Sequence, residues 1–520
     1  MWPLLPVSAA TAKTLNVCTE ASPEGFDYAL FYANSTADAS SEPLYNRLIE
    51  FAPGTTQLVP ALAERWDISA DGRSYTLHLR PGVKFHRTPW FTPTRTHNAD
   101  DVIFSIKRQI DPKNPWFAEA RQGWYYASAM GLDKLITAVS RVDALTVRIE
   151  LSRAEAPFLA DLAMGFLSIL SAEYADKLRS AGTMQRMNSQ PVGTGPFVFR
   201  SYSKDALVRY DANPDYFRGR VKLDRLLFSI TPDGATRLQR IKAGECDVSL
   251  YPSPQEWASL RANPKLSLLT GSPLNTAYIE LNGEHRPLQD KRVRQALNLA
   301  TDKQALIRAV FNNAAEPAAN PFPRSQWGYD DSARPYALDL PQARALLAEA
   351  GVAQGFTLKL WVRAGTGGAN PNPKATAELL QADWAKIGVK LTIVTLEWGE
   401  LLHRVQAGEH DAVLLSWASD NADPDNFLTP TLSCAGIKGG SNSSRWCNAA
   451  FDQLLDTARK TQDIAQRTPL YQRAQRIFRD EAPWVTLVHP VMAIAINKKV
   501  RGLTISPLSL NNYAAVDIQP

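Results

Sequence analysis

The sequence predicts an α/β protein of at least two domains, on the basis of its length, its composition and the order of its secondary-structure patterns. Its 520 residues are too many for one hydrophobic core, and a hydrophobic content of 45% is sufficient to fill several. Beyond the middle of the chain, helical and strand-like segments alternate. This alternation is typical of α/β lobes, which bind ligands with the loops at the carboxyl ends of their strands.

The first part of the chain contains strands and an amphipathic helix. Residues 13–18 and 74–79 alternate between apolar and polar side chains, as strands do. Residues 98–108 predict an N-capped helix with Asp100 and Asp101 in its first turn, where carboxylates are favourable. Paired carboxylates also occur in general acid/base sites, but the position of this pair favours capping.

The second half predicts a helix–strand succession. Residues 292–300 and 375–386 have helical periodicity, and residues 390–394 form a strand after the second helix. A loop, another helix and a strand ending at Asp420 follow. This order places Asp420 at the carboxyl end of a strand, where α/β lobes bind ligands.

Asp420 directly follows an apolar run that begins at Ala412, so its carboxylate is expected at the mouth of a buried strand. A carboxylate in that position is costly unless a positive group meets it, and the ammonium of a ligand is one candidate. The alternative is that Asp420, Asp423 and Asp425 fill a polar turn before a new element, with Pro424 as its breaker.

Charge and hydropathy exclude some classes of protein. The net charge of +5 arises from 57 basic and 52 acidic residues, and no dense Lys/Arg block indicates a nucleic-acid partner. After the N-terminus, no segment approaches the roughly 18 uninterrupted apolar residues of a membrane-spanning helix. Residues 1–12 resemble the tail of a secretory signal peptide, with cleavage expected before Lys13, although a disordered leader is an alternative. We expect an exported, soluble protein.

The four cysteines favour disulfides in an oxidising compartment, with buried thiols as the alternative. Cys434 and Cys447 flank a Gly/Ser/Asn-rich stretch that has few apolar residues to order it, and a disulfide would staple this loop. Cys18 and Cys246 each follow strand-like residues and could pair across a sheet. We expect no metal site and no cofactor, since there is no Cys-x-x-Cys and the seven histidines are scattered.

Several blocks of sequence resemble the extracytoplasmic solute-binding proteins of family 5, which serve peptide and nickel ABC transporters. In the order of that family, the blocks are Leu62–Trp66, Tyr75–His86, Asn98–Val102, Gly193–Phe197 and Pro287–Ala296. Three further segments, Glu20–Asp27, Thr395–Glu400 and Ser416–Phe427, are similar to the dipeptide-binding branch. The resemblance covers nearly all of the chain after Lys13.

The resemblance implies a two-lobed periplasmic binding protein fold of the cluster C type, with a two-strand hinge and an extra subdomain inserted in the first lobe. It implies disulfides between Cys18 and Cys246 and between Cys434 and Cys447. The expected domain organisation is a leader at 1–12, a lobe I core at 13–45, 190–272 and 491–520, an inserted subdomain at 46–189, and lobe II at 273–490.

The resemblance also implies ligand-binding residues. Asp420 matches the aspartate that holds the ligand's α-ammonium, and Trp398 matches an aromatic wall beside the ligand's side chains. Gly367 stands where dipeptide binders place an arginine for the α-carboxylate, and Arg363 is the arginine in that loop.

Two further residues are candidates for the cleft. Trp417 lies on the strand that leads to Asp420, where packing is an alternative role, and Asn34 lies in a loop of the first lobe that is expected to face the cleft.

The expected function is therefore capture of dipeptides or short peptides in the periplasm for an ABC importer. The expected partners are a short peptide with a free amino terminus and an inner-membrane ABC permease, and the protein is expected to be a monomer and not an enzyme. One alternative is a relative that serves antimicrobial-peptide resistance or binds haem or a metal chelate. An exported hydrolase using Asp423 and Asp425 is less favoured, since no Gly-x-Ser-x-Gly or His-Glu-x-x-His motif occurs.

Overall fold

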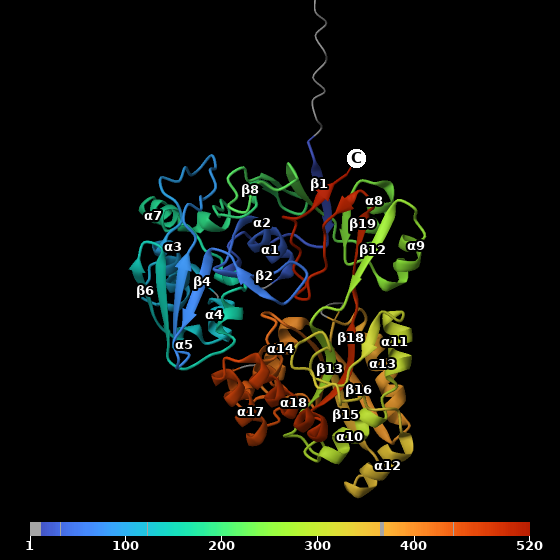
Figure 1. Ribbon diagram of the computed structural model, residues 1–520. Coiled ribbons are helices and arrows are strands. Elements are labelled where there is room, and N and C mark those ends of the chain that lie inside the picture. Colours follow the sequence, from blue (N-terminus) through green and yellow to red (C-terminus); the bar gives the residue numbers. More distant parts are fainter. Residues whose placement is uncertain (1–11, 32, 122, 365–368, 440, 520) are drawn as a thin grey trace, which may run out of the picture.

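The computed structural model describes residues 12–31, 33–121, 123–364, 369–439 and 441–519. Within these residues, the larger sheets contain seven, six and four strands. We call the seven-stranded sheet and its helices lobe I, the six-stranded sheet and its helices lobe II, and the four-stranded sheet with its helices the inserted subdomain. Figure 1 shows lobe I at the top, lobe II below it, and the inserted subdomain beside lobe I.

Lobe I has the strand order β12-β19-β11-β1-β10-β9-β8, in which β1 runs parallel to both β10 and β11. Its strands are β1 (Thr14–Thr19), β8 (Phe197–Ser203), β9 (Leu207–Ala212), β10 (Arg225–Ile230), β11 (Val248–Leu250), β12 (Leu266–Gly271) and β19 (Met492–Asn497). Its helices are α1 (Asn34–Ala39), α2 (Ser41–Leu44), α8 (Gly234–Ala243) and α9 (Trp257–Arg261). A small ribbon of β20 (Val500–Arg501) and β21 (Asp517–Ile518) completes it.

The inserted subdomain has the antiparallel strand order β4-β5-β7-β6. Its strands are β4 (Ala63–Ile68), β5 (Ser74–Leu79), β6 (Ile136–Asp143) and β7 (Thr146–Leu151), and the ribbon β2 (Ile49–Phe51) with β3 (Leu58–Pro60) precedes them. Its helices are α3 (Ala99–Ile110), α4 (Tyr125–Ala129), α5 (Leu132–Leu135), α6 (Phe158–Asp161) and α7 (Ala172–Ser180). The expected helix near Asn98 is α3. Asn98 and Asp101 form its capping box, so Asp101 is a structural carboxylate.

Lobe II has the strand order β14-β18-β13-β17-β15-β16, with β15 parallel to β16 and β17. Its strands are β13 (Asn275–Leu281), β14 (Ala315–Pro317), β15 (Phe356–Arg363), β16 (Val389–Leu396), β17 (Ala412–Ala418) and β18 (Trp484–Pro490). Its helices are α10 (Lys291–Leu299), α11 (Lys303–Phe311), α12 (Leu340–Glu349), α13 (Pro373–Ala385), α14 (Trp398–Gln406), α15 (Asp425–Leu432), α16 (Gly436–Gly439), α17 (Ala449–Lys460) and α18 (Ile464–Glu481). Single 3-10 turns elsewhere in the chain span Tyr28–Leu30, Phe117–Glu119, Gly165–Leu167, Met184–Asn188 and Pro254–Glu256.

The unit β15–α13–β16–α14–β17 brings the carboxyl ends of three parallel strands to one edge of the lobe II sheet. This confirms the predicted helix–strand succession. The last strand ends two residues earlier than expected, at Ala418, so Asp420 lies in the loop after β17. That loop leads into α15, and both belong to the wall of the cavity described below.

Two strand pairs connect the lobes. The chain passes from β12 in lobe I to β13 in lobe II, and returns from β18 to β19. Because β12 pairs with β19 and β13 pairs with β18, the two connections lie side by side and form a two-strand hinge (Figure 1). Both described ends of the chain lie on lobe I.

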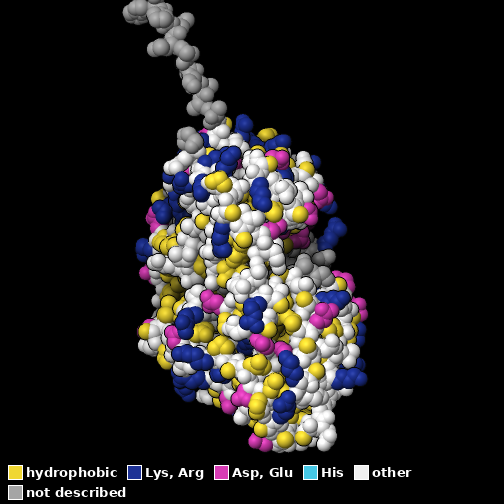
Figure 2. Space-filling model, turned by 90° about the vertical axis from the view of Figure 1, so that its right-hand side faces the viewer, with side chains coloured by type: hydrophobic (Ala, Val, Ile, Leu, Met, Phe, Trp, Pro, Cys, Tyr) yellow, Lys and Arg dark blue, Asp and Glu magenta, His cyan; other side chains and the backbone are white. Residues whose placement is uncertain are grey.

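Each part of the molecule has its own core. One cluster of buried apolar side chains lies in lobe I and extends to Phe85, Phe91, Trp116 and α7. Further clusters lie in the inserted subdomain, behind the lobe II sheet, and under α15, α17 and α18. On the face shown in Figure 2, acidic and basic side chains are interspersed over the surface. Within the described residues, no helix is long and apolar enough to cross a membrane.

Candidate functional site

A cavity of about 660 Å³ lies where lobe I, the inserted subdomain and lobe II meet. Ligand sites commonly have volumes of roughly 300–1,000 Å³ and lie between domains. Lobe I contributes Asn34. The inserted subdomain contributes Tyr125, Tyr126, Ala129, Met130, Leu135, Arg153, Glu155, Pro157 and Asp161. Lobe II contributes residues of β17, the following loop, α15, the disulfide loop and α17.

Asp420 is the acidic residue of the cavity that most resembles a cation-binding group. Its Oδ1 accepts a hydrogen bond of 3.4 Å from the Tyr126 hydroxyl, and its Oδ2 accepts one of 3.3 Å from Asn426 Nδ2. Both bonds are long, and among the described residues no cationic side chain acts on this carboxylate. Burial raises the pKa of Asp420 to about 6. A ligand's cation would offset this cost of burial.

Hydrogen bonds from backbone N–H groups to nearby side chains hold the loop around Asp420 in place. The Asp420 N–H donates to Asn426 Oδ1 at 3.0 Å, and the Ala422 N–H donates to Ser419 Oγ at 2.9 Å. Ala422 adopts a positive φ of 58°, so the chain reverses sharply there. The side chain of Asp420 is thereby fixed at the cavity wall.

The neighbouring carboxylates have other partners. Both oxygens of Asp423 accept hydrogen bonds from the Arg467 guanidinium, at 2.8 and 2.9 Å, and this buried pair is structural. Asp425 lines the cavity, and its Oδ1 accepts a hydrogen bond of 2.7 Å from Thr429 Oγ1. Asp423 therefore has the structural role expected of a residue in a polar turn. Asp420 differs from Asp423 because it has no cationic partner among the described residues.

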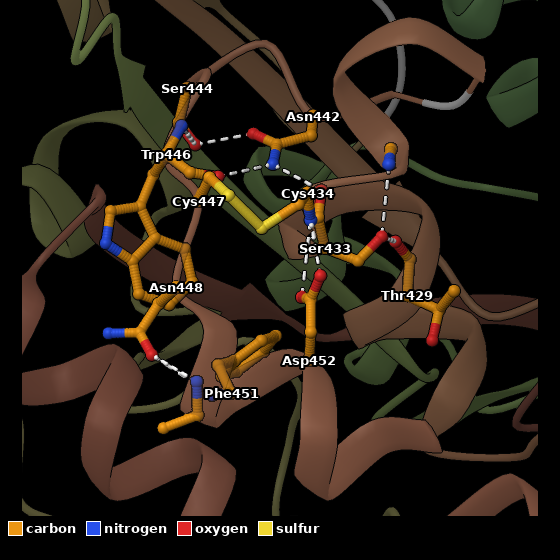
Figure 3. Close-up of a disulfide and its surroundings, with 12 residues drawn as sticks. Thr429, Ser433, Cys434, Asn442, Ser444, Trp446, Cys447, Asn448, Phe451 and Asp452 are labelled. Carbon is orange, nitrogen blue, oxygen red and sulfur yellow. Dashed lines mark hydrogen bonds between the residues drawn. A yellow bond between two sulfur atoms is a disulfide. The ribbon is translucent and has the colours of Figure 1, made fainter.

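The disulfide loop between Cys434 and Cys447, drawn in Figure 3, contributes residues to another part of the cavity wall. Cys434 and Cys447 are bonded, as are Cys18 and Cys246 in lobe I, so both expected pairings are present. Inside the loop, Asn442 Nδ2 donates to the carbonyls of Ser433 and Trp446, each at 2.9 Å. Four residues of or beside this loop line the cavity: Ser433, Ala435, Gly436 and Ser441.

Asn34, Trp417 and Asp420 are brought together by the cavity, as three of its lining residues. The Trp417 Nε1–H donates to Asn426 Oδ1 at 3.3 Å, so this side chain both packs and borders the site.

Trp398 and Arg363 lie together at the neighbouring sheet edge and do not line the cavity in its described part. The Arg363 guanidinium lies 4.7 Å from the centre of the Trp398 ring. Gly367 lies outside the described residues. Ala369, which follows that segment, donates its N–H to Ser416 Oγ at 3.2 Å, and Ser416 lines the cavity.

Sequence reasoning missed the residues that the inserted subdomain contributes. Tyr126 contacts Asp420, and Asp161 Oδ1 accepts a hydrogen bond of 2.7 Å from Asn421 Nδ2. These partners are 294 and 260 residues apart in sequence. No local sequence pattern marks Tyr126 or Asp161. The acidic segment after β17 can be recognised in the sequence, but it identifies only the lobe II partner of each contact.

Two α/β lobes joined by two strands, with a cavity between them, have the architecture of a two-lobed binding protein. The chain belongs to the family of bacterial extracellular solute-binding proteins, family 5, whose model matches residues 57–439. Within the described residues, no group of three or more His, Cys, Asp or Glu is placed to hold a metal ion.

Three similar proteins illustrate this relationship. Di/tripeptide-binding protein 4 of Pseudomonas aeruginosa is 53% identical, over 99% of this chain and 97% of that protein. Heme-binding protein A of Haemophilus influenzae is 45% identical, over 98% of this chain and 93% of that protein. The crystal structure of a dipeptide-binding protein from Pseudoalteromonas sp. SM9913 in complex with Met-Leu has a TM-score of 0.84 and 37% identity, and the match covers 98% of this chain and 100% of that one.

Proposed function

We propose that this protein is the periplasmic substrate-binding component of an ABC importer and captures peptides of two or three residues between its lobes. The observation that carries the proposal is Asp420, a partly buried carboxylate without a cationic partner among the described residues, in a cavity between lobes. A peptide's α-ammonium would supply the missing charge. The names of the di/tripeptide-binding relatives support the same ligand class.

Side-chain positions around Asp420 support a division of roles. Trp417, Tyr126 and Asn34 would border the amino-terminal part of the peptide. Trp398, stacked under Arg363, would give a flat wall beside the ligand's side chains next to the segment that contains Gly367.

Further parts of the proposal concern the whole protein. Domain boundaries at 46, 190, 273 and 491 are supported by the strands, because β4–β7 fall within 46–189 and β13–β18 within 273–490. The closed form would be the shape that an inner-membrane permease recognises. We propose that the protein acts as a monomer.

The test is to identify what the protein carries. Protein purified from a periplasmic extract without refolding is denatured, and the released small molecules are identified by mass spectrometry. We expect peptides of two or three residues with free amino termini. Release of haem, seen also as a visible absorption band in the native protein, would favour the haem-binding relatives. Amino-terminally blocked compounds would contradict the assigned role of Asp420, and longer peptides would contradict the proposed length of the ligand.

A further inference from the structure

Besides Asp420, the cavity is lined by a cationic group, the Arg459 guanidinium, which lies on α17. Asn426, which contacts Asp420, and Thr429, which contacts Arg459, are separated by three residues on α15. Residues three apart lie on one helical face, about 4.5 Å apart along the axis. A negative and a positive side chain therefore border neighbouring parts of one cavity.

Arg459 has few hydrogen bonds for a guanidinium. Its Nη1 lies 3.5 Å from Thr429 Oγ1, and its Nη2 lies 3.9 Å from Asp456 Oδ1. Its Nε is buried and has no hydrogen-bond partner within the described residues. Since a guanidinium has five N–H donors, this side chain, which is 22% exposed, retains unused capacity for an anion.

The nearby carboxylates do not occupy this capacity. Asp425 is bound by Thr429, and Glu155 Oε2 accepts a hydrogen bond of 2.9 Å from Arg153 Nε. Burial opposes the charge on Arg459, but the fields of Asp425 and Glu155 raise the pKa of this group. Arg459 thus remains a cation at every physiological pH.

We propose that Arg459 binds a carboxylate of the same ligand whose ammonium is held by Asp420, so that the cavity recognises a zwitterion. This inference rests on the proposed function. A planar guanidinium can bind a carboxylate with two parallel hydrogen bonds. It would replace the arginine that the sequence lacks at Gly367. The carboxylate has two sources in a short peptide: the carboxyl terminus, about 7 Å from the amino terminus of an extended dipeptide, or an acidic first side chain.

The test is calorimetric titration of ligand-stripped wild-type, R459M, R363M and K460Q proteins. The ligands are Ala-Ala, Ala-Ala amide, Glu-Ala amide and Gln-Ala amide. Lys460 is the matched control, since it carries the same charge one residue away, is exposed and pairs with Asp456. R363M tests the arginine at the neighbouring sheet edge, which does not line the described cavity.

A terminal carboxylate predicts that amidation of Ala-Ala weakens binding by the wild type about 10- to 100-fold, and that R459M does not distinguish the two peptides. If Arg459 instead binds a side-chain carboxylate, the wild type should bind Gln-Ala amide about 10- to 100-fold more weakly than Glu-Ala amide, and R459M should bind the two equally. K460Q should behave as the wild type in both comparisons.

The inference is overturned if R459M discriminates between the ligands as the wild type does, or if R363M alone loses the discrimination. If R459M binds none of the ligands, R459K and thermal unfolding decide. Restored binding with discrimination supports the assignment, whereas absence of binding together with a lowered unfolding temperature in both variants assigns Arg459 to folding alone. Absence of all peptide binding by the wild type would overturn the proposed function together with this inference, whereas failure of Arg459 alone leaves the role of Asp420 intact.

Discussion

Asp420 illustrates how one residue can be unfavourable for the free protein and favourable for binding. Its carboxylate has two long hydrogen bonds and no cation within the described residues, and burial raises its pKa to about 6. A bound ammonium would supply both charge and hydrogen bonds to the ionised form. Binding should therefore lower the pKa of Asp420 and release a proton when it starts from the protonated state.

The affinity for peptides should consequently depend on pH. Because the pKa of free Asp420 lies above its ordinary value, the free protein holds a proton there below about pH 6. Only the ionised form attracts the ammonium, so affinity should be highest near pH 7 and fall by up to about tenfold per pH unit below pH 6. It should also fall above about pH 8, where the α-amino group of the peptide loses its proton. Calorimetry between pH 4.5 and 8, with thermal unfolding as the control for folding, measures this. An affinity that is unchanged between pH 4.5 and 7.5 would contradict the role of Asp420.

The sequence was informative about site residues on lobe II and less so about the others. Asp420 could be predicted because an acidic residue after an apolar strand is a local pattern, and Trp417 and Asn34 also border the cavity. Arg459 and Asp161 could not be predicted, since their importance depends on contacts between distant parts of the chain.

At the scale of elements, β17, α15 and the disulfide loop form one side of the cavity. The helices were predictable from periodicity and caps: Asn98 caps α3, and Asn372 caps α13 with a side-chain bond to the Ala375 N–H. The loop between Cys434 and Cys447 was predictable as a stapled segment. The path of this loop along the cavity could not be predicted, because it depends on hydrogen bonds made by Asn442 and on the packing of α15.

Removal of the Cys434–Cys447 disulfide should affect both stability and binding. The bond closes a 13-residue separation, so the C434S/C447S variant should lose up to about 3 kcal/mol of unfolding free energy in the chain-entropy model. Peptide affinity should also fall, because binding must then order a wall of the cavity. Denaturant unfolding and calorimetry measure the two effects.

The Cys18–Cys246 disulfide provides the matched comparison, since it spans 228 residues and lies in lobe I among residues that do not line the cavity. The C18S/C246S variant should lose roughly 5 kcal/mol in the same model while its peptide affinity is retained, provided that it folds. Equal loss of affinity in both variants would show that the loop has no specific role in binding.

At the scale of the whole molecule, contacts across the cavity hold the inserted subdomain against lobe II. Asn421 donates to Asp161, Tyr126 donates to Asp420, and the Ala156 N–H donates to the Arg459 carbonyl at 2.7 Å. Asn421 is adjacent to Asp420 in the chain. A ligand bound to Asp420 would therefore contact the segment that holds the inserted subdomain against lobe II, and would favour closure.

The bond between Asp161 and Asn421 should contribute to the closed state. Burial raises the pKa of Asp161 well above its ordinary value, so the neutral D161N variant, which keeps an acceptor for Asn421, should bind peptide nearly as the wild type does. D161L removes the acceptor and should weaken binding about tenfold, since a buried amide then lacks its partner. Calorimetry gives the affinities, and small-angle scattering with saturating peptide should show a larger radius for D161L. The same affinity for D161L and D161N would exclude this contact from closure.

The central claim is that the lobes close on a free amino terminus held by Asp420, and the most direct test is calorimetry with Ala-Ala and N-acetyl Ala-Ala on wild-type and D420N proteins. The control is E400Q, which removes an exposed acid on α14 that pairs with Arg404 outside the cavity. We predict that acetylation of the peptide and the D420N substitution each reduce the binding free energy by roughly 3 kcal/mol, which is more than 100-fold in affinity. Their combination should be little worse than either change alone. E400Q should bind Ala-Ala as the wild type does. Binding of Ala-Ala by D420N with wild-type affinity, or tight binding of the acetylated peptide by the wild type, would contradict the claim.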